Sequence, residues 1–278
     1  MGRNEPEGGQ DETVTSQTRA MSFNAAADRY AAYRPSYPSE LFGALAELAG
    51  FPLAGARVAD VGAGTGISTA QLLERGAEVI AVEPGAGMAA WFRKSLPDAP
   101  LIRGDANALP LADSSRDLIT YAQSWHWTDT ARSVPEALRV LRPGGSLAIW
   151  WNITALDVPW IAEQTERITR HTGATSPSLS PIDDPDAVRR AGLDGLRIAR
   201  RHVRWSRTVP LDTHLGNLAS HSGFLVMDEE ETREFLDAER VRLRALFPDE
   251  RIAETYVVDL WVAGDAEGGP AQAGHPTR

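Results

Sequence analysis

Short apolar runs alternate with segments whose apolar positions recur at helical spacing over residues 57–152. The runs predict strands at 57–61, 78–83, 101–103, 117–124 and 146–152, and the segments between them predict helices at 67–75, 87–95 and 131–141. Pro143, Gly144 and Gly145 end the last of these helices, because proline cannot continue a helix and glycine permits the left-handed turn. This alternation predicts an α/β fold on a mostly parallel sheet with helices on both faces.

After residue 152 the pattern is looser. It predicts helices at 159–171, 211–220 and 228–246, a loop at 172–186, and strands at 202–209 and 255–263. The two late strands bring the sheet to seven. We expect the late helices, together with N-terminal ones, to form a helical lid over the mouth of the sheet.

Composition narrows the class of protein. A chain of 278 residues suits one large domain with additions, and the polar stretches 1–20 and 265–278 predict disordered tails. The chain has no cysteine, which excludes disulfides, thiolate metal sites and cysteine nucleophiles, and the histidine spacing predicts no metal site. No apolar run is long enough for a signal peptide or a membrane span, so we expect a cytoplasmic protein without a membrane partner.

The net charge of −10 disfavours a nucleic-acid partner. Arginines at 189–190 and within 197–207 are the clusters that could form a local basic face. The alternative is that they are the solvated faces of a helix and a strand.

A glycine-rich turn, Asp60-Val61-Gly62-Ala63-Gly64-Thr65-Gly66, lies between the first predicted strand and its helix. In an open α/β sheet this turn faces the crevice where ligands bind. A dinucleotide fingerprint needs glycine at position 67 and a phosphate loop needs lysine there, but the residue is Ile67. The turn therefore suits adenosylmethionine, which offers an amine, a carboxylate and a ribose but no phosphate.

Two acidic residues follow in the expected order. Glu83 ends the second predicted strand, where a carboxylate can accept hydrogen bonds from both ribose hydroxyls. Asp105 follows the third strand and could bind the adenine amino group, with Ala106 contributing its backbone. The order and spacing of the acids and the glycine turn support one adenosylmethionine site.

The segments VADVGAGTG, VIAVEPGAGM, GDANALPLADSSRDLI and EALRVLRPGG closely resemble the successive motifs of class I S-adenosylmethionine-dependent methyltransferases. SFNAAADRYAAYRPSYP and SWHWTD resemble a bacterial subgroup that is similar to the trans-aconitate methyltransferases and to enzymes of natural-product pathways. The resemblance covers about residues 22–152. It implies a Rossmann-like cofactor-binding core with N-terminal lid helices at 21–152, a substrate-recognition region at 153–264, and a small-molecule acceptor, expected to be a bacterial secondary metabolite.

The resemblance also implies roles for individual residues. Gly62, Gly64 and Gly66 would line the methionine part of the cofactor, and Gln123 would face it. Tyr30 and Arg34 would clasp the cofactor carboxylate from above. The full set of expected cofactor contacts is Tyr30, Arg34, Asp60, Gly62, Ala63, Gly64, Gly66, Glu83, Pro84, Met88, Asp105, Ala106 and Gln123.

His126 is the candidate catalytic residue, because it follows the fourth strand at the rim of the site and a histidine can accept a proton near neutral pH. The alternative is that it orients its loop while Trp125 and Trp127 pack under the cofactor. The expected substrate contacts are Tyr33, Trp125, Trp127, Trp151 and His221. For the tryptophans and for the pair His214 and His221, plain packing is the alternative.

Three other functions remain open. A nicotinamide oxidoreductase is disfavoured by the glycine spacing. A nucleic-acid methyltransferase is disfavoured by charge and by Gln123-Ser124-Trp125-His126, which stands where an Asn/Asp-Pro-Pro-Phe/Tyr motif would be. A non-catalytic cofactor-binding domain is not excluded, and a homo-oligomer is left open.

Overall fold

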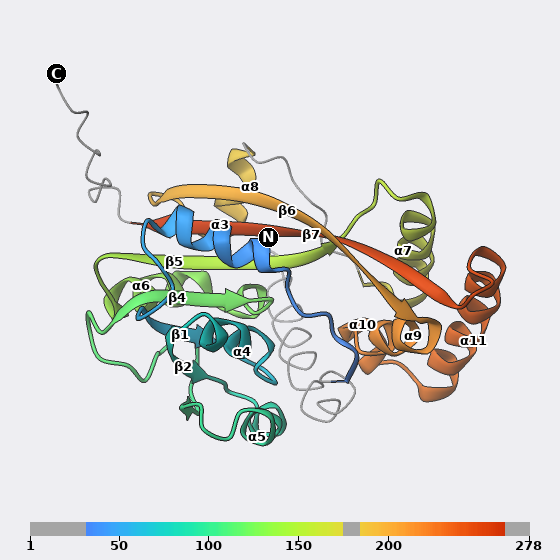
Figure 1. Cartoon of the computed structure of the whole chain (residues 1–278), viewed down its shortest axis with the longest axis horizontal. Helices are drawn as coiled ribbons and strands as arrows, with labels where there is room; N and C mark the ends of the chain where they lie inside the picture. The colour runs from blue at the N-terminus through green and yellow to red at the C-terminus, as the bar shows by residue number, and fades with distance from the viewer. Residues whose placement is uncertain (1–31, 175–183, 265–278) are drawn as a thin grey trace, which may run out of the picture.

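The computed structural model of the chain describes residues 32–174 and 184–264. Tyr30, most of the segment 22–38 and both predicted tails lie outside these residues. Figure 1 shows one sheet crossing the molecule, with helices packed along it and a helical group at one end.

The sheet has seven strands in the order β3-β2-β1-β4-β5-β7-β6 (Figure 1). They are β1 (Arg57–Val61), β2 (Glu78–Val82), β3 (Leu101–Ile102), β4 (Arg116–Ala122), β5 (Leu141–Thr154), β6 (Arg197–Pro210) and β7 (Arg251–Gly264). The pairs among β1 to β5 are parallel, whereas β7 runs antiparallel to both β5 and β6. The predicted α/β fold with a mostly parallel seven-stranded sheet is confirmed.

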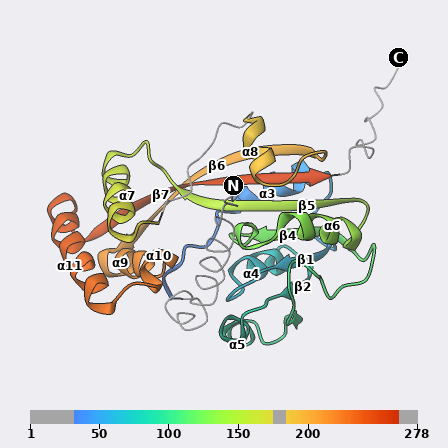
Figure 2. The same cartoon turned by 180° about the vertical axis from the view of Figure 1, so that it is seen from behind.

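Helices cover both faces of this sheet. On one face α3 (Ser39–Ala49) and α4 (Ile67–Glu74) pack against a core that includes Trp150 of β5. On the other face α6 (Thr130–Val140) and α8 (Pro185–Arg190) pack against Ile119 and Ile149. The remaining core helix, α5 (Ala86–Ser95), follows β2, and a short 3-10 helix, η1 (Trp125–Trp127), follows β4. Figure 2 shows α6 and α8 from behind.

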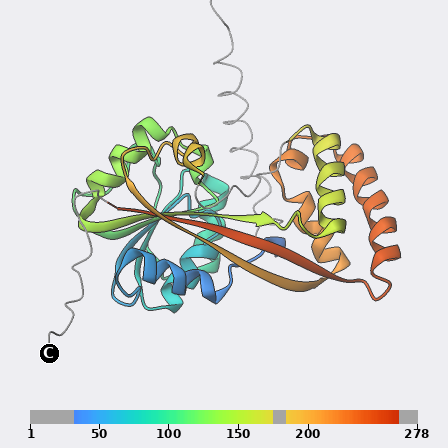
Figure 3. The same ribbon diagram turned by 90° about the horizontal axis from the view of Figure 1, so that it is seen from above.

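A second, helical lobe lies beyond the carboxyl ends of the parallel strands (Figure 3). It consists of α7 (Pro159–Thr172), α9 (Leu211–Ala219), α10 (Ser222–Leu225) and α11 (Glu229–Leu246). Its own core includes Leu215, Leu218, Phe224, Leu243 and Ile252. Among the described residues, no helix has the length and apolarity needed to cross a membrane.

Strands β6 and β7 connect the two lobes, and here the prediction was too short. Each strand has 14 residues, and they pair from Arg197 with Gly264 to Pro210 with Arg251. The segment after residue 153 therefore contributes to both lobes. The ends of β6 and β7 lie outside the sheet core. The apolar alternation that predicts strands is therefore lost at these ends, although the pairing continues. The short helices α8 and α10 were not predicted.

The arginine clusters are bound within the fold. Arg189 and Arg190 pair with carboxylates of their own helix and its N-cap. Along β6, arginines 200, 201, 204 and 207 pair with Asp259, Glu47, Asp157 and Glu254. The charges of these six arginines are therefore balanced within the protein.

Candidate active site

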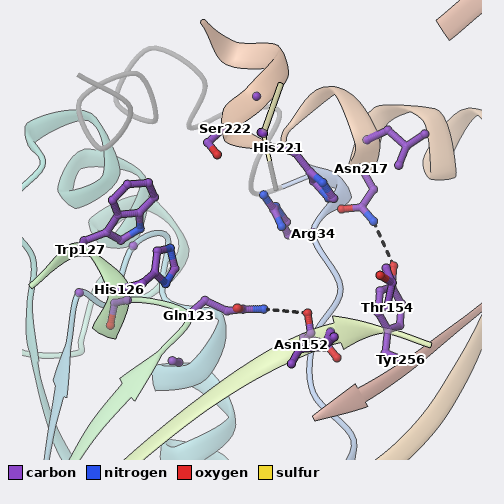
Figure 4. Close-up of a pocket in the computed structure, with 18 of the residues that line it drawn as sticks. Arg34, Gln123, His126, Trp127, Asn152, Thr154, Asn217, His221, Ser222 and Tyr256 are labelled. Carbon is purple, nitrogen blue, oxygen red and sulfur yellow. Dashed lines mark hydrogen bonds between the residues drawn. The ribbon is translucent and has the colours of Figure 1, made fainter. Parts of the chain in front are cut away.

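A cavity of about 390 Å³ lies between the carboxyl ends of the parallel strands and the helical lobe (Figure 4). One wall is formed by the glycine turn, the β2 end and the β4 end. The other wall is formed by α7, α9 and α10, which contribute Ile161, His214 and Phe224 among others. A smaller cavity of about 80 Å³ adjoins it between the glycine turn and α9.

The glycine turn requires its glycines for three different reasons. All three have positive φ, which other residues rarely adopt. A Cβ at Gly62 would lie 2.5 Å from the Cβ of Ser124, so this glycine permits close packing of the β1 and β4 ends. A Cβ at Gly64 would meet nothing within 4 Å and would project into open space, whereas one at Gly66 would strike Leu96 and Phe92. Of the three, only Gly62 and Gly64 line the large cavity, and Gly66 instead supports helix packing.

Glu83 directly follows the end of β2 and lines the large cavity. Its two carboxylate oxygens accept hydrogen bonds from the backbone N–H groups of Gly64 (2.9 Å) and Gly85 (2.6 Å). Burial raises the pKa of Glu83, and these two N–H donors oppose that rise. A carboxylate oxygen accepts more than one hydrogen bond, so Glu83 keeps the capacity to bind a ribose diol.

The predicted adenine contacts lie beside it. Asp105, Ala106, Pro84 and Met88 all line the large cavity. One oxygen of Asp105 accepts a hydrogen bond from the backbone N–H of Asn107 at 2.9 Å, which fixes the carboxylate and leaves its other oxygen available.

Asp60 lies outside both cavities. It is fully buried, and its carboxylate accepts hydrogen bonds from the hydroxyls of Thr69 (2.6 Å) and Thr120 (2.7 Å). Burial raises the pKa of Asp60 to about 6, against the effect of these hydroxyls. Asp60 therefore links α4 to β4 through these two hydroxyls and does not line either cavity.

Gln123 and Arg34 border both cavities. Gln123 has φ of +59°, an unfavourable conformation for a residue other than glycine, directly at the end of β4. Its side chain lies near the backbone oxygen of Asn152, and Arg34 donates to the backbone oxygen of Ser220 at 3.1 Å. Figure 4 shows Arg34 close to His221, on the side of the cavity formed by the helical lobe.

His126 faces the cavity from η1, next to Trp127. Its Nδ1 accepts a hydrogen bond from Nε1–H of Trp151 at 3.3 Å. The His126 ring is exposed to the cavity, but desolvation by the surrounding cavity walls, and then the positive charge of Arg34, lower its pKa to about 4. The ring is therefore neutral at pH 7, with its proton on Nε2.

Three predicted substrate contacts do not line either cavity. Trp125 is 2% exposed, and its indole N–H donates to the backbone oxygen of Ala191 at 2.9 Å in the sheet core. The Tyr33 ring packs on α9, where a Cβ at Gly216 would lie 2.7 Å from it. Trp151 reaches the site through its hydrogen bond to His126. These three residues are structural in this geometry, whereas Trp127 and His221 do line the cavity.

Several cavity residues were not predicted. Among them are the polar residues Asn152, Thr154, Gln164, Asn217 and Tyr256, which come from β5, β7 and the helical lobe. A partial signal existed for Asn217, because it is a polar residue on the apolar face of a helix and is 3% exposed. For Tyr256 no signal existed, since its position depends on the pairing of β6 with β7.

His214 belongs to a buried polar group at the far end of the large cavity. Its Nδ1 lies 2.7 Å from an oxygen of Glu254, and its Nε2 lies 3.0 Å from Oε1 of Gln164. Arg207 pairs with the other oxygen of Glu254. Both ring nitrogens are thus occupied within the protein.

These features fit adenosylmethionine. A carboxylate for the ribose, a fixed carboxylate near the adenine position and an open space at Gly64 lie in one cavity. No lysine lines either cavity in the described part of the chain, and Arg34 is the only lining arginine there, so a pyrophosphate would find a single cationic side chain.

Comparison with known proteins places the chain in a family. The family profile described as "Methyltransferase domain" matches residues 59–149. An uncharacterised methyltransferase of Mycobacterium tuberculosis (strain H37Rv) is 42% identical over 158 residues, which are 57% of this chain and 63% of that protein. An uncharacterised methyltransferase-like protein of Schizosaccharomyces pombe is 30% identical over 73% of this chain and 77% of its own length.

A solved structure shows the same fold. A putative type II methyltransferase from Anaeromyxobacter dehalogenans superposes with a TM-score of 0.61 at 23% identity and covers 83% of this chain and 97% of its own. The predicted family and its cofactor, S-adenosylmethionine, are thereby confirmed. The predicted similarity to the trans-aconitate subgroup is not confirmed. The chain belongs to the class I S-adenosylmethionine-dependent methyltransferases.

Proposed function

We propose that this protein transfers a methyl group from S-adenosylmethionine to a small-molecule acceptor bound in the cavity between the two lobes. The single observation that carries the proposal is the continuity of that cavity. It runs from Glu83 and Gly64, on the cofactor side, to Ile161 and Phe224 of the helical lobe. When bound, the cofactor supplies an electrophilic methyl group on a sulfonium.

The acceptor side has a mixed character. Trp160, Ile161, Ile168 and Phe224 provide apolar walls, and Gln164, His214 and Glu254 form a polar end. A cavity of this size and lining suits a small amphipathic molecule. We also propose that this molecule is a secondary metabolite, and this part of the proposal is supported by the resemblance of the motifs alone.

His126 acts in this proposal as a hydrogen-bond donor through Nε2–H and not as a general base. Its Nδ1 is engaged by Trp151, and its pKa of about 4 makes it a weak base. Burial and the charge of Arg34 also lower the pKa of His221, which makes that ring a weak base as well. The site therefore favours acceptors whose nucleophile carries no proton at neutral pH, and catalysis by alignment.

A nucleic-acid acceptor is disfavoured in this proposal, because six arginines of β6 and α8 pair with carboxylates of the fold. The test is release of adenosylhomocysteine from adenosylmethionine with separated fractions of a cell extract. We expect release with the small-molecule fraction. Release only with the nucleic-acid or protein fraction would contradict the proposal, as would the absence of release with every fraction.

A further inference from the structure

Two side-chain amides, Asn152 and Asn217, face both cavities from opposite lobes. Asn152 lies on β5 and Asn217 on α9, so they are far apart in the sequence. Each has one buried polar atom without a hydrogen-bond partner among the described residues, namely Nδ2 of Asn152 and Oδ1 of Asn217. A buried polar atom left without a partner is costly, and its retention at a cavity wall indicates a ligand atom that completes it.

The orientation of each amide is fixed by an aromatic neighbour. The indole Nε1–H of Trp205 donates to Oδ1 of Asn152 at 3.0 Å, and an indole N–H is only a donor. The N–H₂ group is therefore the group of Asn152 that is left without a partner among the described residues. Asn217 donates from Nδ2 to the hydroxyl oxygen of Tyr256 at 3.1 Å (Figure 4), and that hydroxyl also hydrogen-bonds with Glu254.

Since a carboxylate only accepts, the hydroxyl proton of Tyr256 goes to Glu254, and the same oxygen accepts from Asn217. The carbonyl oxygen is therefore the group of Asn217 that is left without a partner among the described residues. Trp205 and Tyr256 are paired across β6 and β7, and their rings stack at a centroid distance of 5.4 Å. One aromatic pair thus sets both amides.

The smaller cavity has the glycine turn on its other side, with Gly62, Ala63, Gly64 and Thr65. A donor and an acceptor with fixed directions, next to this turn and away from Glu83 and Asp105, match a zwitterion that has a carboxylate and an ammonium on one carbon. On the basis of the proposed function, we infer that Asn152 and Asn217 bind the amino-acid end of the cofactor. Asn152 donates to its carboxylate, and Asn217 accepts from its ammonium.

This assignment has a consequence for the helical lobe. Asn217 belongs to α9, so the helical lobe binds the cofactor directly as well as enclosing the acceptor. The two residues should then respond in opposite ways to the same isosteric change. Asn152→Asp replaces a donor by a negative charge facing a carboxylate, whereas Asn217→Asp places a negative charge beside an ammonium.

The test is calorimetric binding at pH 8 of two ligands to the full chain. S-adenosylhomocysteine has the amino-acid end, and 5′-methylthioadenosine has the adenosyl thioether without it. We expect Asn152→Asp to bind S-adenosylhomocysteine about tenfold or more weakly, and Asn217→Asp to bind it at least as tightly as the unmodified protein does. Both variants should bind 5′-methylthioadenosine with unchanged affinity.

Two further variants keep the test decisive if one Asp variant unfolds. Trp205→Phe removes the N–H that orients Asn152 while keeping a stacked ring, so it should weaken only S-adenosylhomocysteine binding. Glu230→Gln is the control for an isosteric change of charge, because Glu230 lines neither cavity and pairs with Arg233 at an exposed position on α11. It should change neither affinity, and thermal unfolding without ligand checks that each variant is folded.

Equal effects of Asn152→Asp and Asn217→Asp on S-adenosylhomocysteine would overturn the inference, as would equal losses for both ligands. Failure of the unmodified protein to bind either ligand would instead overturn the proposed function itself.

Discussion

Nε1–H of Trp151 donates to Nδ1 of His126 across 3.3 Å, which leaves the only proton of the neutral imidazole on Nε2. This relationship sets the chemical character of the one histidine that the sequence marks for catalysis. It presents an N–H group to the cavity, and protonation of the ring would require the indole N–H to move away. Trp151 is thus a positioning residue for His126.

We predict that His126 titrates with a midpoint near pH 4 in the folded protein, against about 6.5 for an unperturbed histidine. Because the pKa of His126 is lower in the folded protein than in the unfolded chain, the neutral ring contributes to the free energy of unfolding above pH 6.5. This contribution is lost as the pH falls from 6.5 to 4. Nitrogen-15 NMR of labelled histidine measures both the midpoint and the tautomer.

Trp151→Phe should raise that midpoint and allow proton exchange between Nδ1 and Nε2, since the N–H that favours the unprotonated Nδ1 is gone. A midpoint near 6.5 in the unmodified protein, or a proton on Nδ1, would contradict this description of His126.

The glycine turn gives a matched pair of variants. Gly62→Ala should lower the melting temperature, because its Cβ would lie 2.5 Å from the Cβ of Ser124 and cost about 1–3 kcal/mol. Gly64→Val should mainly weaken binding of S-adenosylhomocysteine, since its side chain would enter open cavity space at a positive φ. Thermal unfolding and calorimetry separate the two effects, and equal melting temperatures with equal affinities would contradict the assignment.

The sheet and the cofactor side of the site were predictable because their residues are local in sequence. A strand, a glycine turn and a helix place Gly62 and Gly64, and strand ends place Glu83 and Asp105 without any long-range information. Gly66 and Asp60 show the limit of this reasoning, since the same turn contains a helix-packing glycine and a buried supporting carboxylate.

The acceptor side could not be predicted in the same way. Asn152 and Tyr256 reach the cavity through the pairing of β5 with β7, which joins residues such as Thr154 and Tyr256 that are about a hundred positions apart, and through the pairing of β7 with β6. Trp125 and Trp151 lie near His126 in the fold, but the side that each presents to the core depends on α8 and β7. Sequence spacing does not encode those contacts.

Asp60 should show the opposite pH dependence to His126. Its raised pKa of about 6 means that a stability contribution present below pH 4 is lost as the pH rises to 6 and above, to a limit of roughly 3 kcal/mol. Asp60→Asn removes this titration, so its stability relative to the unmodified protein should increase from pH 4 to pH 8 in denaturant unfolding. Asp113→Asn, at an exposed position, is the control. Parallel stability curves for Asp60→Asn and the unmodified protein would show that Asp60 does not titrate in this range.

The helical lobe should depend on Glu239. This carboxylate is fully buried and accepts hydrogen bonds from Arg167 at 2.6 and 3.0 Å and from Gln164 at 3.1 Å. Glu239→Ala leaves Arg167 without this partner and should destabilise the protein by about 3 kcal/mol. Glu230→Ala removes an exposed pair with Arg233 and should cost less than about 1 kcal/mol. Similar losses in both variants, measured by chemical denaturation, would count against a structural role for the buried network.

The most direct test of the account is calorimetric titration of S-adenosylhomocysteine into the unmodified protein and into Glu83→Gln. We predict saturable binding at one site per chain. The variant should bind about tenfold or more weakly, because the glutamine side chain keeps the shape of the glutamate but loses the charge that accepts the ribose hydroxyls. Absence of binding, saturable binding of NADH in its place, or an affinity unchanged by Glu83→Gln would contradict the placement of the cofactor in this cavity.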